Sequence, residues 1–320
     1  MKKTFALSSV SLLISVASLS ASWTTLALPN RISFNNTSMS HLSDGRLIYA
    51  HDGTIYQQAT FGSATLNTYS NAPSGDYGFV TGNGFVGAGG FAAASVYSYS
   101  ASSTSSSFTS IATKQNYGAV SYNGTSILMS GGNGSGSVSE IGHLNSSGTY
   151  TSIVENVSTY SGGFTLDSTG NLYVADNDDS NIYSFTASQV TNALLGTALS
   201  VSDGELVTNL GVSGSLAIDS LGRLYVTGWE SNGIQVFDLN TEQAASILPG
   251  AANTNYSVST FSDGANDYVS WLNWSGYDAG DSVTYGYNQD SLVVVPEPAT
   301  SALVLGLMSL TLLVLRRRRG

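Results

Sequence analysis

Short runs in which apolar and polar residues alternate, separated by turn residues, fill the middle of the chain. The clearest runs are 172–175 (LYVA) and 224–227 (LYVT), and each follows an Asp-x-x-Gly sequence. A period of two is typical of β-strands, and glycine closes the turn between strands because it adopts positive φ without steric cost. No window shows a sustained apolar period of 3.6 residues. The pattern therefore predicts an all-β fold.

An internal repeat contains both runs. Residues 166–175 align without gaps with residues 218–227, and each copy continues into a second strand, at 181–185 and at 233–237. A period in the forties with several short strands per unit is the signature of a β-propeller. Weaker copies of the turn bring the turn glycines to six, spaced 39 to 52 residues apart: Gly45, Gly84, Gly124, Gly170, Gly222 and Gly264.

The two strong copies resemble NHL and SMP-type propeller repeats, whose strands read Leu-Tyr-Val-Ala-Asp followed by Asn and Ile-x-x-Phe. Residues 172–185 and 224–237 carry this pattern, whereas the other copies depart from it. Some propellers of this superfamily are lactonases or lyases with a central metal held by Glu, Asn and Asp. The resemblance does not transfer those ligands to positions of this sequence.

Six turn glycines predict a β-propeller of about six blades, or seven if residues 200–210 or 285–295 contribute further strands. A propeller hides its terminal edges by joining the two chain ends in one blade. The apolar segments 32–34 and 292–295 are available for this purpose. We therefore expect the last strand before the C-terminal tail to pair with the first blade.

The N-terminus has the three parts of a secretory signal peptide. Lys2 and Lys3 precede an apolar stretch at 5–19, and small residues follow at 20–22. Cleavage after Ala21, Ser22 or Ala27 fits this pattern, and we assign residues 1–27 to the signal peptide. A buried helix or a retained anchor is the alternative, although the apolar stretch is short for a membrane span. The sequence thus predicts export through the secretion translocon.

The C-terminus carries a second, three-part signal. Pro296, Glu297 and Pro298 precede seventeen uncharged residues at 299–315. At 1.5 Å per residue this segment reaches about 25 Å as a helix, the short end of a membrane span. A cluster of arginines stays on the cytoplasmic side of a membrane, which predicts that the body lies outside. The cluster here comprises Arg316, Arg317, Arg318 and Arg319.

This tail resembles the PEP-CTERM sorting signal of Gram-negative bacteria. The resemblance implies removal near the Pro-Glu-Pro motif by exosortase, a membrane protease-transpeptidase, and a place at the cell surface or in the medium, associated with exopolysaccharide. A plain single-pass anchor is the alternative. The expected organisation is a signal peptide at 1–27, a propeller at 28–295 and a sorting signal at 296–320 with a transmembrane helix at 299–315.

The charge of the propeller segment excludes one class of partner. Six of the ten basic residues lie at the chain ends, which leaves four basic residues against twenty acidic ones between 28 and 295. Nucleic-acid binding depends on Lys and Arg that neutralise phosphates. We therefore expect no nucleic-acid partner. The chain has no cysteine, so disulfides and zinc–thiolate sites are excluded as well.

Asp176, Asp178 and Asp179 suggest a site for calcium or another divalent metal, with Glu230 at the same place in the second repeat copy. Alternate carboxylates are typical calcium ligands. The sequence lacks the glycine and glutamate of an EF-hand loop, because Asn181 and Ala187 stand at those places. The alternative is a polar hairpin loop that needs no cofactor.

Trp271 and Trp274 begin an aromatic cluster that continues with Tyr277, Tyr285 and Tyr287. Aromatic rings stack on sugars, and the exopolysaccharide association of the resembled family makes a polysaccharide ligand available. Aromatic residues are also ordinary core material in strands. Ligand stacking and core packing are therefore both open for the two tryptophans.

No catalytic constellation is visible in the sequence. His41, His51 and His143 have no nucleophile or carboxylate at a motif spacing, and exposed loop histidines are the expected account. Neither Gly-x-Ser-x-Gly nor His-Glu-x-x-His occurs. The sequence therefore favours an exported, non-catalytic binding or structural propeller that contacts exopolysaccharide or envelope proteins. The alternatives are a metal-dependent lactonase- or lyase-like propeller enzyme and a structural fibre subunit.

Overall fold

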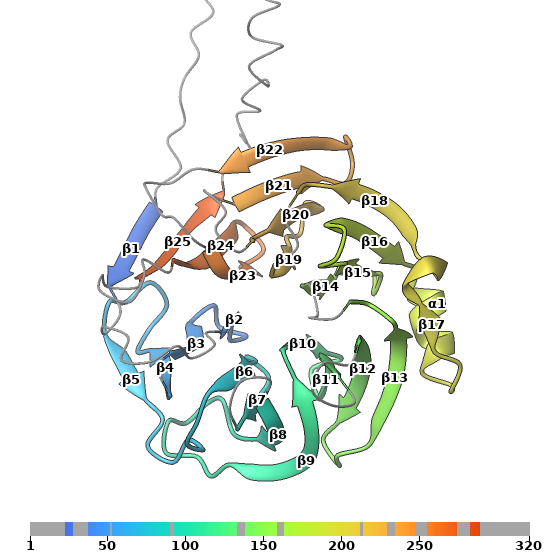
Figure 1. The fold of residues 1–320 in the computed structure, drawn as a ribbon. Helices are drawn as coiled ribbons and strands as arrows, with labels where there is room; N and C mark the ends of the chain where they lie inside the picture. The colour runs from blue at the N-terminus through green and yellow to red at the C-terminus, as the bar shows by residue number, and fades with distance from the viewer. Residues whose placement is uncertain are drawn as a thin grey trace, which may run out of the picture.

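The computed structural model describes residues 23–27, 38–51, 53–89, 93–132, 138–158, 163–211, 214–228, 234–247, 255–273 and 282–288. Within these residues the chain forms six sheets that follow one another around a central axis (Figure 1). Five sheets have four strands and one has five. The predicted all-β propeller is confirmed, and the six sheets agree with the expected number of about six blades.

The first three sheets contain the first half of the propeller. The first sheet is β2 (Ser38–His41), β3 (Leu47–His51), β4 (Thr54–Gln58) and β5 (Leu66–Thr68). The second is β6 (Tyr77–Val80), β7 (Phe85–Ala88), β8 (Ala93–Ser98) and β9 (Thr109–Asn116). The third is β10 (Gly118–Tyr122), β11 (Ser126–Gly132), β12 (Ser139–Asn145), β13 (Tyr150–Glu155) and β17 (Leu199–Ser200).

The other three sheets complete the ring. The fourth sheet is β14 (Phe164–Leu166), β15 (Leu172–Ala175), β16 (Asn181–Phe185) and β18 (Glu205–Asn209). The fifth is β19 (Leu216–Ile218), β20 (Arg223–Val226), β21 (Ile234–Asp238) and β22 (Gln243–Ile247). The sixth, called the closing sheet below, is β23 (Asn255–Ser262), β24 (Asp267–Asn273), β25 (Ser282–Asn288) and β1 (Trp23–Ala27).

One short helix interrupts the strands. Helix α1 (Ala187–Ala193) and a 3₁₀ helix at Val201–Asp203 connect β16 to β18. The sequence pattern predicts no helix here. Thr186 and Gln189 nevertheless form a capping box: the Thr186 hydroxyl accepts the Gln189 backbone N–H at 3.2 Å, and the Gln189 side chain accepts the Thr186 N–H at 2.8 Å. Such a box satisfies backbone donors that a helix N-terminus otherwise leaves free.

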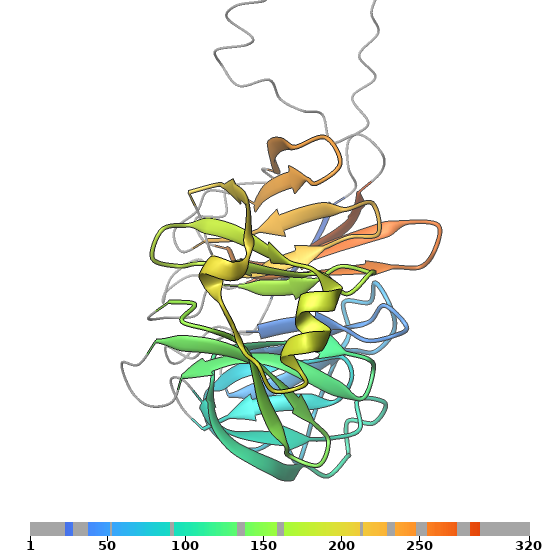
Figure 2. The ribbon, with the colours of Figure 1, turned by 90° about the vertical axis from the view of Figure 1, so that its right-hand side faces the viewer.

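The connections between strands alternate between two faces of the ring, which Figure 2 shows from the side. The first and second strands of every sheet are antiparallel, so the tight turns between them all lie on one face, here called the turn face. The connections between second and third strands, and those from one sheet to the next, lie on the opposite face, here called the loop face. The first strand of each sheet lies nearest the central axis (Figure 1).

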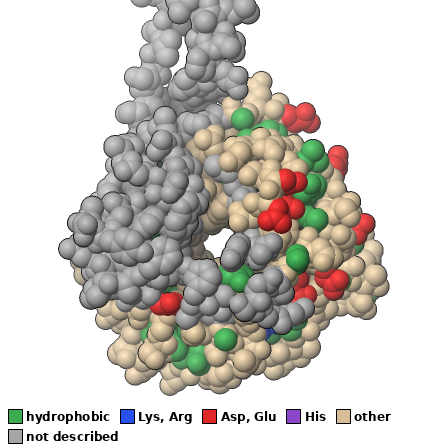
Figure 3. Space-filling view, in the orientation of Figure 1, with side chains coloured by type: hydrophobic (Ala, Val, Ile, Leu, Met, Phe, Trp, Pro, Cys, Tyr) green, Lys and Arg blue, Asp and Glu red, His purple; other side chains and the backbone are tan. Residues whose placement is uncertain are grey.

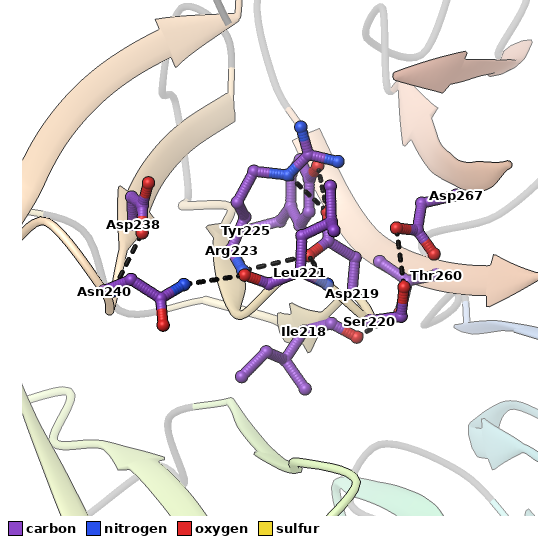
Figure 4. A network of polar contacts seen from close by, with 10 residues as sticks. All are labelled: Ile218, Asp219, Ser220, Leu221, Arg223, Tyr225, Asp238, Asn240, Thr260 and Asp267. Atoms are coloured by element: carbon purple, nitrogen blue, oxygen red, sulfur yellow. Dashed lines mark hydrogen bonds and ion pairs between the residues drawn. The ribbon is translucent and has the colours of Figure 1, made fainter. Parts of the chain in front are cut away.

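The repeated Asp-x-x-Gly sequence is the turn between first and second strands. All six turn glycines that the repeat predicts have positive φ, between +70° and +93°. Figure 4 shows why aspartate opens the strong copies. The Asp219 carboxylate accepts the backbone N–H groups of Leu221 and Arg223 at 3.0 and 2.9 Å. It also accepts the Arg223 guanidinium at 2.6 Å and the Tyr225 hydroxyl at 2.9 Å.

In the inner strands, the residues on both faces of the sheet are buried, and not only those on one face. Every residue of β15 is buried. Leu172 and Val174 share a core with Leu128 of the third sheet, whereas Tyr173 shares a core with Leu224 of the fifth sheet. Alternate side chains point to opposite faces of a strand. The alternation therefore separates two cores, because each sheet packs between two neighbours.

The closing sheet joins both ends of the chain, as expected, but through other segments. Strand β1 pairs with β25 in antiparallel register from Trp23 opposite Gly286 to Ala27 opposite Ser282. Segments 32–34 and 292–295, which the sequence suggests for closure, lie outside the described residues. The segments considered for a seventh blade instead contribute β18 to the fourth sheet and β25 to the closing sheet.

Most of the two sorting segments falls outside the described residues. These include the apolar stretch at 5–19, the Pro296-Glu297-Pro298 motif, the helix predicted at 299–315 and the four arginines after it. The segment assigned to the signal peptide, 1–27, ends with strand β1. Among the residues that the structure describes, no helix is long and apolar enough to cross a membrane.

Removing the Asp219 carboxylate is expected to destabilise the propeller by about 3–5 kcal/mol, because it leaves the Arg223 guanidinium buried without its ion pair. The side chains of Asp219 and Arg223 are only 1% and 6% exposed. Asp44→Ala is the matched control, since the Asp44–Arg46 pair occupies the same turn of the first sheet with side chains 53% and 21% exposed. It should cost about 1 kcal/mol or less. Urea unfolding of Asp219→Ala and Asp44→Ala measures both, and equal losses would contradict this account.

Candidate functional site

The loop face surrounds the mouth of a central channel. Figure 3 views this face and shows an opening at the centre, with acidic side chains beside it among the described residues. The fourth and fifth sheets meet closely at this rim. A Cβ on Gly163, just before β14, would collide with the carbonyl oxygen of Gly214, just before β19. The fourth and fifth sheets are therefore in direct backbone contact at this rim.

The loop after β15 contains three of the four residues suggested as metal ligands. The last residue of β15 is held at the rim, because the Ala175 N–H donates to the carbonyl oxygen of Gly163 at 2.8 Å. The Asp176 carboxylate accepts the Asp178 N–H at 2.9 Å, and the Asp176 carbonyl accepts the Ser180 N–H at 2.9 Å. These contacts fold the segment into a compact hairpin loop on the loop face.

The Asp179 side chain stabilises the conformation of this loop. One oxygen of its carboxylate accepts the Asn181 backbone N–H at 2.8 Å, and the other accepts the Asn181 side-chain amide at 2.6 Å. The Asn209 amide donates to the Asp179 carbonyl at 2.9 Å and to the Asn181 side-chain oxygen at 2.8 Å. The polar-hairpin alternative accounts for Asp179 fully.

Asp176 differs from its neighbours in its electrostatics. Burial of the carboxyl group, together with the negative charges of Asp179 and Asp178, raises the pKa of Asp176. Oδ1 is engaged by the Asp178 N–H, whereas Oδ2 accepts no hydrogen bond from the described part of the chain. A carboxylate with a raised pKa and a free oxygen is suited to general acid–base chemistry. Asp176 is therefore the candidate reactive group of the loop face.

The described residues do not assemble a metal site. Across the ranges that the structure covers, no three His, Asp or Glu side chains converge so as to hold a metal ion. Asp179 already uses both carboxylate oxygens, and Glu230 lies outside the described residues.

The packing of Trp271 contradicts the prediction that this residue stacks on a sugar. Trp271 is 1% exposed and shares a core with Tyr225, Val258 and Val269. Its ring is enclosed between the fifth and closing sheets, so no sugar can stack on it. Core packing, the alternative considered from the sequence, is the correct account of Trp271. Trp274 lies outside the described residues.

The histidines are not exposed loop residues, contrary to expectation. His41, His51 and His143 lie on β2, β3 and β12, and each is buried or half-buried. His51 is completely buried. His143 packs edge-on against Tyr122, with ring centroids 5.4 Å apart, and burial lowers its pKa. Strands β3 and β12 each lie between two neighbouring strands of their sheet, and β2 contacts β6 and β23 of the two neighbouring sheets, so the three histidines are enclosed.

His41 links the first sheet to the closing sheet. Its Nδ1 lies 2.9 Å from the Ser259 hydroxyl and its Nε2 lies 3.1 Å from the Ser270 hydroxyl. The imidazole also stacks on Phe261, with centroids 5.8 Å apart. The two serines lie 218 and 229 residues away along the chain, so no motif spacing reveals this contact.

The His41–Ser270 pair is structural rather than catalytic. Ser270 is 1% exposed, which keeps substrates away from its hydroxyl. Burial lowers the pKa of His41 to about 3, although a hydrogen bond with the backbone of Thr260 partly offsets this effect. Within the described residues no carboxylate contacts the imidazole to orient it as a triad requires. The neutral ring instead holds the two sheets together.

Comparison with known proteins extends these observations. No protein-family model matches the sequence, and no curated protein matches it. Solved structures do match. The calcium-binding protein regucalcin from Agrobacterium tumefaciens aligns with a TM-score of 0.58 at 10% identity, over 82% of this chain and 91% of that chain. A luciferin-regenerating enzyme aligns with a TM-score of 0.57 at 11% identity, over 84% and 96% of the two chains.

A gluconolactonase from Xanthomonas campestris is similar to the same degree, with a TM-score of 0.57 at 12% identity, over 82% of this chain and 89% of that chain. At such low sequence identities the structural likeness shows the fold alone, and the chain is a β-propeller. The neighbours also correct the expectation of a non-enzyme, because a gluconolactonase and a luciferin-regenerating enzyme share this fold. That expectation relied on missing linear motifs, whereas catalytic groups are often carried on separate loops of a rigid scaffold.

The depressed pKa of His41 predicts a loss of stability in mild acid. The folded protein resists protonation of His41 down to about pH 3, whereas the unfolded chain takes up the proton near pH 6.5. Stability is therefore complete above pH 6.5 and falls as the pH drops from 6.5 towards 3, by about 2 kcal/mol between pH 7 and pH 5 for this one group. Urea unfolding at pH 7, 6 and 5 measures the slope.

His41→Gln should flatten this slope, because glutamine keeps a donor and an acceptor but does not titrate. His143→Gln is the control and should keep most of the slope, since His143 is only half-buried. The window above pH 5 avoids the titration of ordinary carboxylates. A slope that survives in His41→Gln would show that other groups cause the acid sensitivity.

Proposed function

We propose that this chain is an exported propeller enzyme that hydrolyses lactones at the mouth of the channel on the loop face. The observation that carries the proposal is the Asp176 carboxylate on the loop face, which has a raised pKa and whose Oδ2 accepts no hydrogen bond from the described residues. The likeness to a gluconolactonase and a luciferin-regenerating enzyme supports an enzymatic role for the fold. A lyase reaction is the second candidate from the sequence, and it would also need a proton-accepting carboxylate.

In the proposed reaction Asp176 acts as general base. It takes a proton from water as the water oxygen bonds to the lactone carbonyl carbon. The ring C–O bond then breaks, and the leaving alkoxide takes the proton back from Asp176. One lactone and one water thus give one hydroxy acid, and the enzyme returns to its starting state.

Asp176→Asn should lower the rate of lactone hydrolysis by the full chain at least about 100-fold, because an amide does not accept the proton. Glu205→Gln is the matched control: Glu205 is exposed on the outer strand β18, and its replacement should leave the rate unchanged. Proton release from sugar-derived lactones measures turnover, and thermal melts verify that both variants are folded. Equal rates in the three proteins would exclude Asp176, and no turnover by the wild type would exclude the function.

The same assay distinguishes a metal requirement. Regucalcin is a calcium-binding protein, so Ca²⁺ is the first cation to add after EDTA treatment, followed by Zn²⁺. Turnover that survives EDTA supports the carboxylate acting alone. Turnover that needs the cation and is lost in Asp178→Ala or Glu230→Ala would identify ligands, one of which lies outside the described residues.

We also propose that the two ends of the chain direct this enzyme to the cell surface of a Gram-negative bacterium. The signal-peptide pattern would engage the translocon, and the tail would be inserted by residues 299–315 and cut by exosortase near Pro296-Glu297-Pro298. Proline locks φ and resists helix formation, which would favour cleavage of this motif by a protease. An exopolysaccharide setting would make sugar-derived lactones the substrate class.

Replacing Pro296, Glu297 and Pro298 with alanine should leave membrane insertion intact but block release in a host with exosortase. Insertion depends on the apolar segment and the arginines, whereas release depends on the motif. The contrasting variant replaces the four arginines with serine and should weaken retention of the tail instead. Mass spectrometry of the surface protein decides: a wild-type C-terminus ending at Gly320 would show a plain anchor.

A further inference from the structure

Strand β1 is the fourth strand of the closing sheet. All five of its residues have a Cα partner in β25, from Trp23 to Ala27. Every other sheet has at least four strands, so the closing sheet would have three without β1. The outer edge of β25 would then present unpaired backbone groups, which are a template for aggregation.

The same strand joins the beginning of the ring to its end. Residues 28–37 lead directly from β1 into β2 of the first sheet. A protein that began at Leu28 would keep β2 but lose the strand that attaches its N-terminus to the closing sheet. The first and closing sheets would then rely on side-chain contacts, such as those of His41 with Ser259 and Ser270.

The residues before β1 discriminate among the three cleavage positions that the signal-peptide pattern allows. Signal peptidases require small residues at the first and third positions before the cut. Cleavage after Ser22 places Ser22 and Ser20 there, whereas cleavage after Ala21 places the bulky Leu19 at the third position. Cleavage after Ala27 places Thr25 there and removes β1 completely.

We infer that the leader is cut between Ser22 and Trp23, so that β1 stays on the mature protein as the outer strand of the closing sheet. The inference rests on the proposed export. It shortens the leader from residues 1–27 to residues 1–22. Leader removal and ring closure then become compatible, because the first residue after the cut is the first residue of β1.

The test is the N-terminus of the exported, full-length gene product from a Gram-negative host, measured by mass spectrometry. A chain that begins at Trp23 is the expected result. A chain that begins at Leu28 would overturn the inference, and one that begins at Ser22 would overturn the assigned bond. An exported chain that still begins at Met1 would overturn leader removal, whereas a chain found only in the cytoplasmic fraction would overturn the proposed export itself, which separates the two failures.

A pair of cysteines tests whether the retained strand closes the ring. Thr25 and Thr284 are directly opposite in the register, and the chain has no other cysteine to interfere. In the oxidising periplasm, Thr25→Cys with Thr284→Cys should cross-link in most of the exported protein. Thr25→Cys with Tyr285→Cys, one position out of register, is the matched control and should remain reduced. Equal cross-linking of the two pairs, or none in the first, would show that β1 does not occupy this edge.

Discussion

Closure of the ring is the constraint on which the rest of this propeller depends. Six sheets can bury both of their faces only if the last one packs against the first, and the closing sheet achieves this with strands from both chain ends. Polar contacts, as well as packing, hold the closing sheet against the fifth sheet and the first sheet. The Ser220 hydroxyl donates to Asp267 at 2.8 Å and the Thr260 hydroxyl donates to the Ile218 carbonyl at 2.6 Å on one side (Figure 4), and His41 bridges the other side.

The two faces of the ring use their carboxylates differently. On the turn face, Asp167, Asp219 and Asp263 accept backbone N–H groups and tyrosine hydroxyls of their own turns, so these charges are part of the scaffold. Such hydrogen bonds lower the pKa of Asp167 and Asp263 despite the opposing effect of burial on Asp167. On the loop face the pKa of Asp176 moves in the other direction, because burial of the carboxyl group, followed by the charges of Asp179 and Asp178, outweighs its one hydrogen bond. A reactive carboxylate is therefore expected on the loop face, where Asp176 is not fully engaged in hydrogen bonds that stabilise the fold.

The sequence predicts local structure better than contacts between distant segments. The six turn glycines identify the blades because a turn needs positive φ at a fixed place, and this requirement is visible in one residue. The partners of His41 could not be predicted, since Ser259 and Ser270 approach only when the ring closes. The burial of Trp271 also depends on the neighbouring sheet. Strand β1 was hidden within the segment assigned to the leader, because its WTTLA sequence has no apolar alternation strong enough to indicate a strand.

The direction in which the chain ends leave the ring relates the fold to the proposed sorting. Strand β1 begins opposite Gly286, and β25 ends with Asn288 opposite Asp267, which directly follows the turn of Asp263 and Gly264. Both ends therefore leave the closing sheet at the turn face. A tail inserted through residues 299–315 would hold the turn face towards the membrane and leave the loop face towards the outside. Substrates that diffuse in from the surroundings would then meet the channel mouth and Asp176 first, whereas the carboxylates that face the membrane are those already bound within their own turns.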